Sequence, residues 1–212
     1  MDLRKFLAQL DASGELQIID GADWDLEIGA ITEVSNEKEG PALLFDNIKG
    51  YPPGYRVLTD LIATPGRVAA AFQTPFTSNI ELVRHIKEKF KELKPTPPRN
   101  VDSGPVLENV AEGNEIDMMR FPVPKWHEHD GGRFMGTADM VITRDPKSGW
   151  VNVGTYRVQL HDADTLGLYI SPGHHGRLMR ESYWAEGKSC PVVVVFGAHP
   201  LVWIPSTLGI PW

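Results

Sequence analysis

The sequence lacks the features that mark secreted and membrane-bound proteins. It has a single cysteine, Cys190, so no internal disulfide can form, and a reducing compartment, the cytoplasm, is expected. Its first residues, MDLRKFLAQL, carry no apolar run of the kind found in secretion signals. The longest apolar run, residues 191–198, is far shorter than the ~20 residues of a membrane helix. We therefore expect a soluble, cytoplasmic protein that makes no contact with a membrane.

The sequence also has no block of positive charge. Its 21 lysines and arginines are outnumbered by 28 acidic residues, which gives a formal net charge of −7. Even the most basic stretch, residues 84–99, contains charges of both signs. A nucleic-acid partner is not expected, and a small molecule is the more natural ligand. The chain has 212 residues, 42 % of them hydrophobic, which is enough for a sizeable core in one or two domains.

The first 100 residues alternate between helical and extended patterns. The clearest helix is residues 79–93, where Ile80, Val83, Ile86, Phe90 and Leu93 recur on one face and charged residues cover the other. Helix starts are indicated by Asp2 as an N-cap and by Thr64 followed by a proline. The expected helices are 2–10, 25–35, one beginning at 65, and 79–93, and the expected strands are 16–19, 42–45 and 56–58. These patterns predict an N-terminal α/β domain, residues 1–100.

The pattern changes at KPTPPRN, residues 94–100, whose three prolines indicate a linker or domain edge. Beyond it, extended runs occur at 139–144, 150–160, 166–171 and 192–198, and helical signal is limited to 176–186. The second domain, residues 101–212, is therefore predicted to be a sheet or barrel with one interrupting helix. The fold class as a whole is α+β.

Polar side chains lie along the strand expected at residues 150–160. Alternation places Asn152, Gly154 and Tyr156 on one face and Arg157 on the other. A bulge at Gly154 could re-aim the strand so that Asn152 and Arg157 serve one site. Without such a bulge, Arg157 is an ordinary surface residue. The spacing leaves both interpretations open.

The next motif is SPGHHGRL, residues 171–178, a loop that leads into a helix. Free backbone N–H groups and the positive end of the helix dipole favour an anion such as phosphate here. Neutral imidazoles of His174 and His175, with the carboxamide oxygen of Asn152, could also hold a divalent metal. The alternative is a histidine pair that caps and solvates the helix start. A zinc site at His127 and His129 is not expected, because their spacing in a proline-rich loop is not that of helical zinc motifs.

Five motifs, in this order along the chain, resemble the UbiD family of reversible decarboxylases. They are PVLENV (105–110), RFPVPKWHEHDGGRFMGT (120–137), VNVGTYRVQ (151–159), SPGHHGRL (171–178) and FGAHPLVWIPSTLGIPW (196–212). The resemblance covers nearly the whole chain. It implies that the second domain is part of a split β-barrel of the flavin-reductase-like type. It also implies that this barrel binds prenylated FMN, a divalent metal, usually Mn2+, and K+ beside the cofactor phosphate.

The resemblance also assigns roles to individual residues. Asn152 matches a metal ligand of the family, and His175 matches the second, although alignment on the preceding proline favours His174 in its place. In the other assignment His174 lies near the phosphate. Arg157 matches an arginine that contacts both cofactor and substrate carboxylate, which a planar guanidinium can grip with two hydrogen bonds. The remaining cofactor-binding residues implied are Thr155, Tyr156, Ser206, Thr207 and Leu208.

The function implied is nonoxidative decarboxylation, or its reverse, of an aromatic or α,β-unsaturated carboxylic acid. Family members are roughly twice as long, so we expect this chain to be the N-terminal part of such an enzyme. We expect it to act as a homo-oligomer or with a complementing C-terminal chain, and a flavin prenyltransferase to supply the cofactor. The alternative is a noncatalytic flavin-binding fragment or subunit. A plain flavin oxidoreductase is less favoured, because no glycine-rich dinucleotide loop is present.

Overall fold

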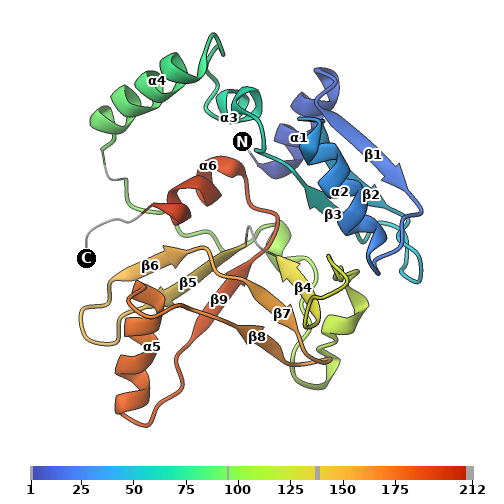
Figure 1. The fold of residues 1–212 in the computed structure, drawn as a ribbon. Helices are drawn as coiled ribbons and strands as arrows, with labels where there is room; N and C mark the ends of the chain where they lie inside the picture. Colours follow the sequence, from blue (N-terminus) through green and yellow to red (C-terminus); the bar gives the residue numbers. More distant parts are fainter. Residues whose placement is uncertain (1, 95, 137–138, 209–212) are drawn as a thin grey trace.

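The computed structural model describes residues 2–94, 96–136 and 139–208. An N-terminal unit of helices and a small sheet lies beside two antiparallel sheets formed by the second half of the chain, and helix α6 lies between them (Figure 1). The architecture is thus a mixture of α and β structure with small sheets, as the sequence predicted in outline. The final residues of the last motif, from 209 onward, lie outside the described residues.

The N-terminal sheet has the order β1-β2-β3, with β1 parallel to β2 and β2 antiparallel to β3. Strand β2 is buried along four consecutive residues, and its side chains enter two apolar clusters built around Phe45 and Phe6. The elements of this unit are α1 (Leu3–Ala12), β1 (Leu16–Asp20), α2 (Glu27–Glu37), β2 (Ala42–Asp46), β3 (Val57–Thr59), α3 (Pro65–Ala71) and α4 (Asn79–Glu92). All the helices and strands predicted for this half are present, with shifts of one or two residues at their ends.

Both predicted N-caps are confirmed. The Asp2 side chain accepts a hydrogen bond from the backbone N–H of Lys5, and the Thr64 hydroxyl accepts one from the backbone N–H of Arg67. The predicted apolar face of α4 is not buried, however. Ile80, Val83 and Leu93 are each more than 60 % exposed, and the buried residue of this helix is Leu82. The periodicity identified the helix correctly, but the described residues leave most of that face uncovered.

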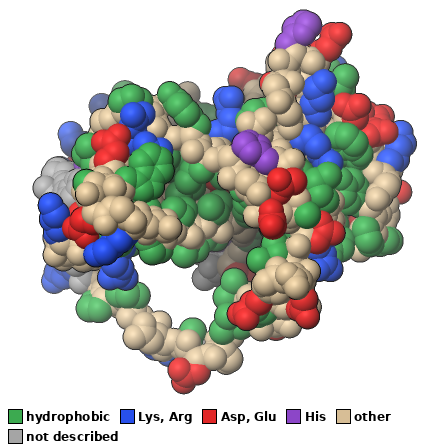
Figure 2. All heavy atoms as spheres, turned by 90° about the horizontal axis from the view of Figure 1, so that it is seen from below, with side chains coloured by type: hydrophobic (Ala, Val, Ile, Leu, Met, Phe, Trp, Pro, Cys, Tyr) green, Lys and Arg blue, Asp and Glu red, His purple; other side chains and the backbone are tan. Residues whose placement is uncertain are grey.

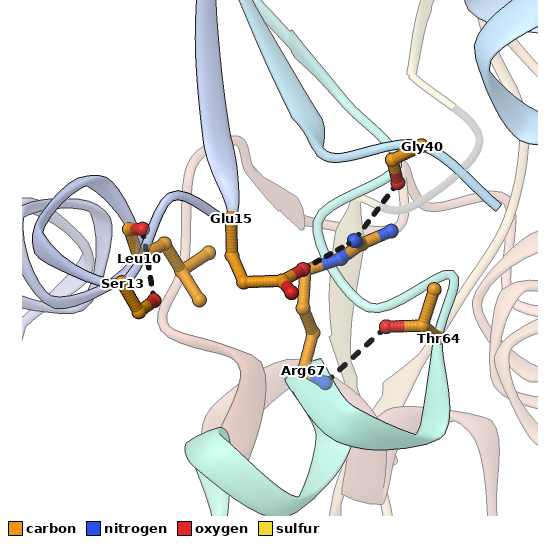
Figure 3. A network of polar contacts seen from close by, with 6 residues as sticks. All are labelled: Leu10, Ser13, Glu15, Gly40, Thr64 and Arg67. Carbon is orange, nitrogen blue, oxygen red and sulfur yellow. Dashed lines mark hydrogen bonds and ion pairs between the residues drawn. The ribbon is translucent and has the colours of Figure 1, made fainter.

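A buried arginine joins three parts of the N-terminal unit. Arg67 on α3 is 1 % exposed, and its Nη1 lies 2.9 Å from both Glu15 Oε2 and the carbonyl oxygen of Gly40 (Figure 3). Glu15 precedes β1 and Gly40 precedes β2, so one guanidinium connects α3 to the start of two neighbouring strands. Its Nε and Nη2 are buried without a partner among the described residues.

The second half contains two three-stranded antiparallel sheets, with strand orders β4-β7-β8 and β6-β5-β9. The strands are β4 (Arg133–Gly136), β5 (Met140–Arg144), β6 (Val151–Gly154), β7 (Val158–Leu160), β8 (Leu166–Leu168) and β9 (Val192–Val195). The helical elements are η1 (Pro105–Leu107), η2 (Gly113–Glu115), η3 (Met118–Arg120), α5 (His175–Ala185), α6 (Pro200–Trp203) and η4 (Ile204–Thr207). These two separate sheets do not confirm the part of a split β-barrel that the resemblance implied, which stays a prediction.

The strand predicted at residues 150–160 is interrupted. It ends at Gly154 and resumes at Val158 in the other sheet, so residues 155–157 form a connection between the two sheets. A continuous strand was therefore the wrong expectation. The chain changes direction after Gly154 at this break. Within the break, side chains no longer alternate strictly between the two faces of a strand.

The segment before β4 returns to the N-terminal unit. The backbone N–H of Lys125 donates to the carbonyl of Trp24 at 3.0 Å, and the N–H of Leu26 donates to the carbonyl of Lys125 at 3.0 Å. A Cβ on Gly29 of α2 would lie 1.9 Å from the carbonyl oxygen of Trp126, so only glycine permits this approach. The two halves of the chain are thus connected by backbone hydrogen bonds and close packing.

Helix α6 connects the same two regions. His199 precedes it, is 7 % exposed, and accepts the backbone N–H of Leu201 at its Nδ1. Its ring also packs edge-on against Phe6 of α1 at a centroid distance of 5.2 Å. Helix α6 runs directly into η4, and η4 contacts β6. The N-terminal helix therefore supports the segment that carries Ser206 and Thr207.

The surface shows no dominant charge on the face seen in Figure 2. Acidic and basic side chains are interspersed there with exposed hydrophobic ones. No helix within the described ranges is long and apolar enough to cross a membrane.

Candidate functional site

A hollow of about 450 Å³ lies where β6, the start of α5 and η4 meet. Its size falls within the range of small-molecule sites. Eight of the nine residues singled out from the sequence line it: Asn152, Thr155, Tyr156, His174, His175, Ser206, Thr207 and Leu208. The other three lining residues are immediate neighbours of these in the sequence. Residues separated by more than 50 positions in the sequence therefore share one cavity.

Asn152 lines this hollow and is held there by a neighbouring strand. It is 6 % exposed on β6, and its amide nitrogen lies 3.4 Å from Thr143 Oγ1 on the neighbouring strand β5. The Thr143 hydroxyl in turn donates to the sulfur of Met179 on α5 at 3.1 Å. Because the amide nitrogen faces Thr143, the carbonyl oxygen is the Asn152 atom that can meet a ligand in the hollow.

Tyr156 forms a wall of the hollow, and two glycines make room for its ring. A Cβ on Gly154 would lie 2.6 Å from the Tyr156 ring, and a Cβ on Gly176 would lie 3.1 Å from it. The ring is 8 % exposed and packs with Val141 and Ile170. Glycine at both positions thus lets α5 approach the connection between the sheets closely.

The two histidines lie at the N-terminus of α5. His174 is the residue before the helix, and its ring meets Tyr156 edge-on at a centroid distance of 5.9 Å. His175 is the first helical residue, and its ring meets Trp150 edge-on at 5.3 Å. The side chain of His174, the N-cap residue, makes no capping hydrogen bond to this 11-residue helix, and the positive end of the helix dipole lies beside the hollow, where it favours an anion. Both histidines line the hollow, and the structure leaves the choice between them as metal ligand open.

Two of the residues that line the hollow, Ser206 and Thr155, bring their hydroxyl groups together. The Ser206 and Thr155 side-chain oxygens are 2.7 Å apart, and the Ser206 hydroxyl is also 2.6 Å from the carbonyl oxygen of Trp203. When Ser206 donates to that carbonyl, it accepts from Thr155. These contacts fix η4 against the end of β6 and place two hydroxyl groups beside the hollow, with both of their protons engaged within the protein.

Arg157 is the predicted site residue that does not line the hollow. Its side chain is exposed, and its Cζ lies 5.1 Å from the centre of the Phe134 ring on β4. Because residues 155–157 connect the two sheets, Thr155 and Tyr156 face the hollow while Arg157 reaches the neighbouring sheet. A ligand would have to extend beyond the hollow to meet this guanidinium.

Comparison with known proteins identifies the family. The N-terminal domain model of 3-octaprenyl-4-hydroxybenzoate carboxy-lyase matches residues 7–89, and the Rift-related domain model of the same enzyme, UbiD, matches residues 99–212. The second match alone spans more than half of the chain. The chain belongs to the UbiD family.

Similar UbiD-family proteins are much longer than this chain. Pyrrole-2-carboxylic acid decarboxylase from Pseudomonas aeruginosa is 34 % identical over 100 % of this chain and 44 % of its own length. The solved vanillic acid decarboxylase of Sedimentibacter hydroxybenzoicus, in its closed form, has a TM-score of 0.90 at 28 % identity and covers 97 % of this chain and 44 % of its own. An evolved dimeric form of HmfF from Pelotomaculum thermopropionicum, solved with prenylated FMN, has a TM-score of 0.85 at 32 % identity, covering 97 % and 46 %. This chain thus spans less than half the length of these relatives.

Two other features of this UbiD-family chain limit the chemistry available. No group of three or more His, Cys, Asp or Glu side chains within the described ranges could hold a metal ion. A second hollow, of about 330 Å³ between α3 and α4, is lined mainly by apolar side chains such as Ile62, Val68 and Leu82. Of these two hollows, the one that Asn152 and Ser206 line is the richer in polar groups.

Sequence reasoning did not anticipate the state of Asp139. This residue, just before β5, is 1 % exposed, and neither carboxylate oxygen has a hydrogen-bond partner among the described residues. Burial raises the pKa of Asp139 to about 7. A Cβ on Gly136 would lie 2.8 Å from its Oδ1, so a glycine gives the carboxyl group its space. An aspartate at the start of an apolar strand carries no local signal that it will be buried.

The raised pKa predicts how Asp139 affects stability. The folded protein keeps the proton up to about pH 7, whereas the unfolded chain releases it near pH ~4. The free energy of unfolding should therefore fall as pH rises between these values. We expect Asp139→Asn to stabilise the protein by about 3 kcal/mol more at pH 8.5 than at pH 5, because about two pH units separate pH 5 from the folded pKa of about 7, as measured by urea unfolding.

Asp145, at the other end of β5, supplies a control of opposite sign. Hydrogen bonds from the Ser148 side chain and backbone lower the pKa of Asp145. Its contribution to stability is therefore present above its unfolded pKa and is lost at lower pH, so Asp145→Asn should destabilise the protein at both pH 5 and pH 8.5. If Asp139→Asn gained no stability relative to the wild type between pH 5 and pH 8.5, Asp139 would not be a buried, proton-retaining carboxyl group.

Proposed function

We propose that this chain forms the cofactor-binding part of a nonoxidative carboxy-lyase that uses prenylated FMN. The substrate would be an aromatic or α,β-unsaturated carboxylic acid, and the reverse carboxylation is included. The observation that carries the proposal is the convergence of Asn152, Thr155, Tyr156 and the Ser206 loop at the start of α5. Family membership and the flavin-bound structure of HmfF provide additional support.

The residues of the hollow fit a phosphorylated, planar ring system. The positive end of the α5 dipole favours a phosphate, and the Thr155 and Ser206 hydroxyls would donate to it once they turn from Ser206 and the Trp203 carbonyl, their partners in this structure. The Tyr156 ring provides a flat apolar wall. Thr207 and Leu208 extend the Ser206 loop, where we place K+ beside the phosphate.

Metal binding by this chain would rest on few ligands. Asn152 can offer its carbonyl oxygen and His175, or His174 in its place, an imidazole nitrogen. Both ligands are neutral, so a Mn2+ or other divalent ion would need negative charge from the cofactor phosphate or from a carboxylate elsewhere. We infer that the metal is held weakly unless the rest of the enzyme is present.

Each side chain would then have a distinct part in the reaction. The Arg157 guanidinium would grip the substrate carboxylate through two parallel hydrogen bonds and so orient the bond to be broken. Prenylated FMN, when bound, would supply the electron sink that the decarboxylation requires. Tyr156 and the Ser206 loop would hold the cofactor ring and phosphate, and the walls of the hollow would limit the access of water.

The remaining elements of the proposal concern partners and location. We place the protein in the cytoplasm and expect a flavin prenyltransferase to supply its cofactor. A homo-oligomer or a complementing C-terminal chain would complete the enzyme. HmfF, one of the solved relatives, is known in an evolved dimeric form.

The direct test of the proposal is turnover by the full-length protein. We expect carbon dioxide release from at least one acid in a panel that includes pyrrole-2-carboxylate, after loading with prenylated FMN but not after loading with FMN. Flavin binding with no turnover of any acid, alone or with the C-terminal part supplied as a second chain, would contradict the enzyme and favour the noncatalytic subunit.

The role of Ser206 can be tested without turnover. Ser206→Ala removes a hydroxyl that we place against the phosphate, and a hydrogen bond to a charged group contributes about 1.5–3 kcal/mol. We expect the Kd for FMN to rise about tenfold while the Kd for riboflavin, which has no phosphate, stays unchanged. Flavin fluorescence titration measures both, and Thr165→Ala in the exposed loop before β8 serves as the control. An equal loss of affinity for both flavins would place the phosphate elsewhere.

A further inference from the structure

The Arg157 guanidinium lies over an aromatic ring, and within residues 2–94, 96–136 and 139–208 no ion-pair partner faces it. Among the described residues, no carboxylate forms an ion pair with it, and its Cζ lies 5.1 Å from the centre of the Phe134 ring. An exposed arginine on a connection between strands would otherwise sample many rotamers. Stacking on an aromatic face restricts the guanidinium plane and leaves its N–H edge available for a planar acceptor.

Phe134 is itself held on both sides of its backbone. Its N–H donates to the carbonyl of Pro124 at 3.0 Å, and its carbonyl accepts the Trp126 indole N–H at 3.0 Å. It also pairs with Gln159 of β7, two residues beyond Arg157. The ring under the guanidinium is therefore attached to a strand whose position is fixed from two directions.

Trp126 connects this arrangement to the N-terminal core. Its side chain packs against the cluster that contains Ile28 and Phe45, and its carbonyl oxygen approaches Gly29 so closely that no side chain fits there. The neighbouring Lys125 pairs through its backbone with residues 24–26. A continuous set of contacts thus runs from the N-terminal sheet through Trp126 and Phe134 to Arg157.

We propose that Phe134 is a positioning residue, which holds the Arg157 guanidinium where it meets the substrate carboxylate, and that Trp126 anchors Phe134 to the N-terminal core. The part played by the carboxylate rests on the function proposed above, whereas the placement of Arg157 does not. The N-terminal unit acquires a role from this arrangement. It supports the anion-binding group of a site formed by the other half of the chain.

The first experiment measures the placement of Arg157 without any substrate. Phenylglyoxal reacts with accessible guanidinium groups, and peptide mass spectrometry follows the rate at Arg157 in the full-length protein. We expect Phe134→Leu, which keeps the bulk but removes the aromatic face, to raise that rate about fivefold. Phe134→Tyr keeps the face and should match the wild type, and exposed Arg99 in the same digests should react at an unchanged rate. An Arg157 rate in Phe134→Leu equal to the wild-type rate would overturn the proposal.

The second experiment measures the consequence for substrate binding. In the full-length enzyme, Phe134→Leu should raise KM for the carboxylic acid about fivefold, and Phe134→Tyr should restore KM. Arg157→Lys combined with Phe134→Leu should be no worse than Arg157→Lys alone, because the ring acts through the arginine. Effects that multiply would show that Phe134 acts independently and would overturn the positioning role.

The anchor is tested by Trp126→Phe, which removes the indole N–H and keeps an apolar ring. We expect the labelling rate of Arg157 to rise about twofold, and a rate equal to the wild type would remove Trp126 from the chain of contacts. If the full-length enzyme turned over no acid, the proposed function would fail. The labelling rates would still decide whether Phe134 positions Arg157.

Discussion

Replacing Arg157 with alanine in the full-length enzyme is expected to lower kcat/KM for decarboxylation about 10³-fold. Two charge-assisted hydrogen bonds to a carboxylate would be lost, each contributing about 2 kcal/mol. A loss of about 4 kcal/mol in transition-state stabilisation corresponds to about three orders of magnitude in rate. The loss should appear in both kcat and KM, because the guanidinium would both hold the acid and orient its bond. Steady-state kinetics on the best acid of the panel measures it.

Two further variants separate the causes of that loss. Arg157→Lys keeps the charge but replaces a planar guanidinium with a point charge. We therefore expect its kcat/KM to exceed that of Arg157→Ala by at most about tenfold. Arg99→Ala removes an exposed arginine from the stretch before the second half and should leave kinetics unchanged. Turnover by Arg157→Ala within tenfold of the wild type would remove Arg157 from the mechanism.

Local patterns predicted the helices well because their signals lie within one turn. The N-caps at Asp2 and Thr64 were correct, since a capping side chain bonds to a backbone N–H only three residues away. The same kind of pattern placed the start of α5 within one residue and put the histidine pair there. Convergence of Asn152 with that pair was an expectation from family resemblance, and the hollow brings these residues together.

Features that depend on distant parts of the chain were not predictable from local pattern. The apolar stripe of α4 forms a helix, but whether anything covers Ile80 or Val83 depends on elements far away in the sequence. The break after Gly154 depends on pairing with two different sheets, and alternation alone favoured one continuous strand. The contacts of Lys125 and Trp126 with the N-terminal unit likewise produce no periodic pattern in the sequence. Tertiary contacts decided each of these cases.

Replacing Arg67 with alanine should cause the largest loss of stability, about 3 kcal/mol. The side chain is 1 % exposed, so the change removes buried methylene packing as well as the hydrogen bonds to Glu15 and Gly40 (Figure 3). Breaking a buried ion pair by deleting one partner costs about 3–5 kcal/mol. The lower end applies here, because the Glu15 side chain is 49 % exposed and water can solvate it afterwards. Urea unfolding should show this loss, and Tm should fall by roughly 6–12 °C.

Arg67→Met separates packing from polar contacts. Methionine fills much of the space and needs no hydrogen bonds, whereas two nitrogens of the arginine are buried without a partner among the described residues. We expect this variant to lose only about half as much stability as Arg67→Ala, since an apolar residue can replace an incompletely satisfied buried charge at little cost. Arg84→Ala, which breaks the exposed pair with Glu81, should cost less than about 0.5 kcal/mol. An Arg67→Met variant as unstable as Arg67→Ala would mean that the guanidinium contacts with Glu15 and Gly40, and not the filled volume, hold α3 against the strands.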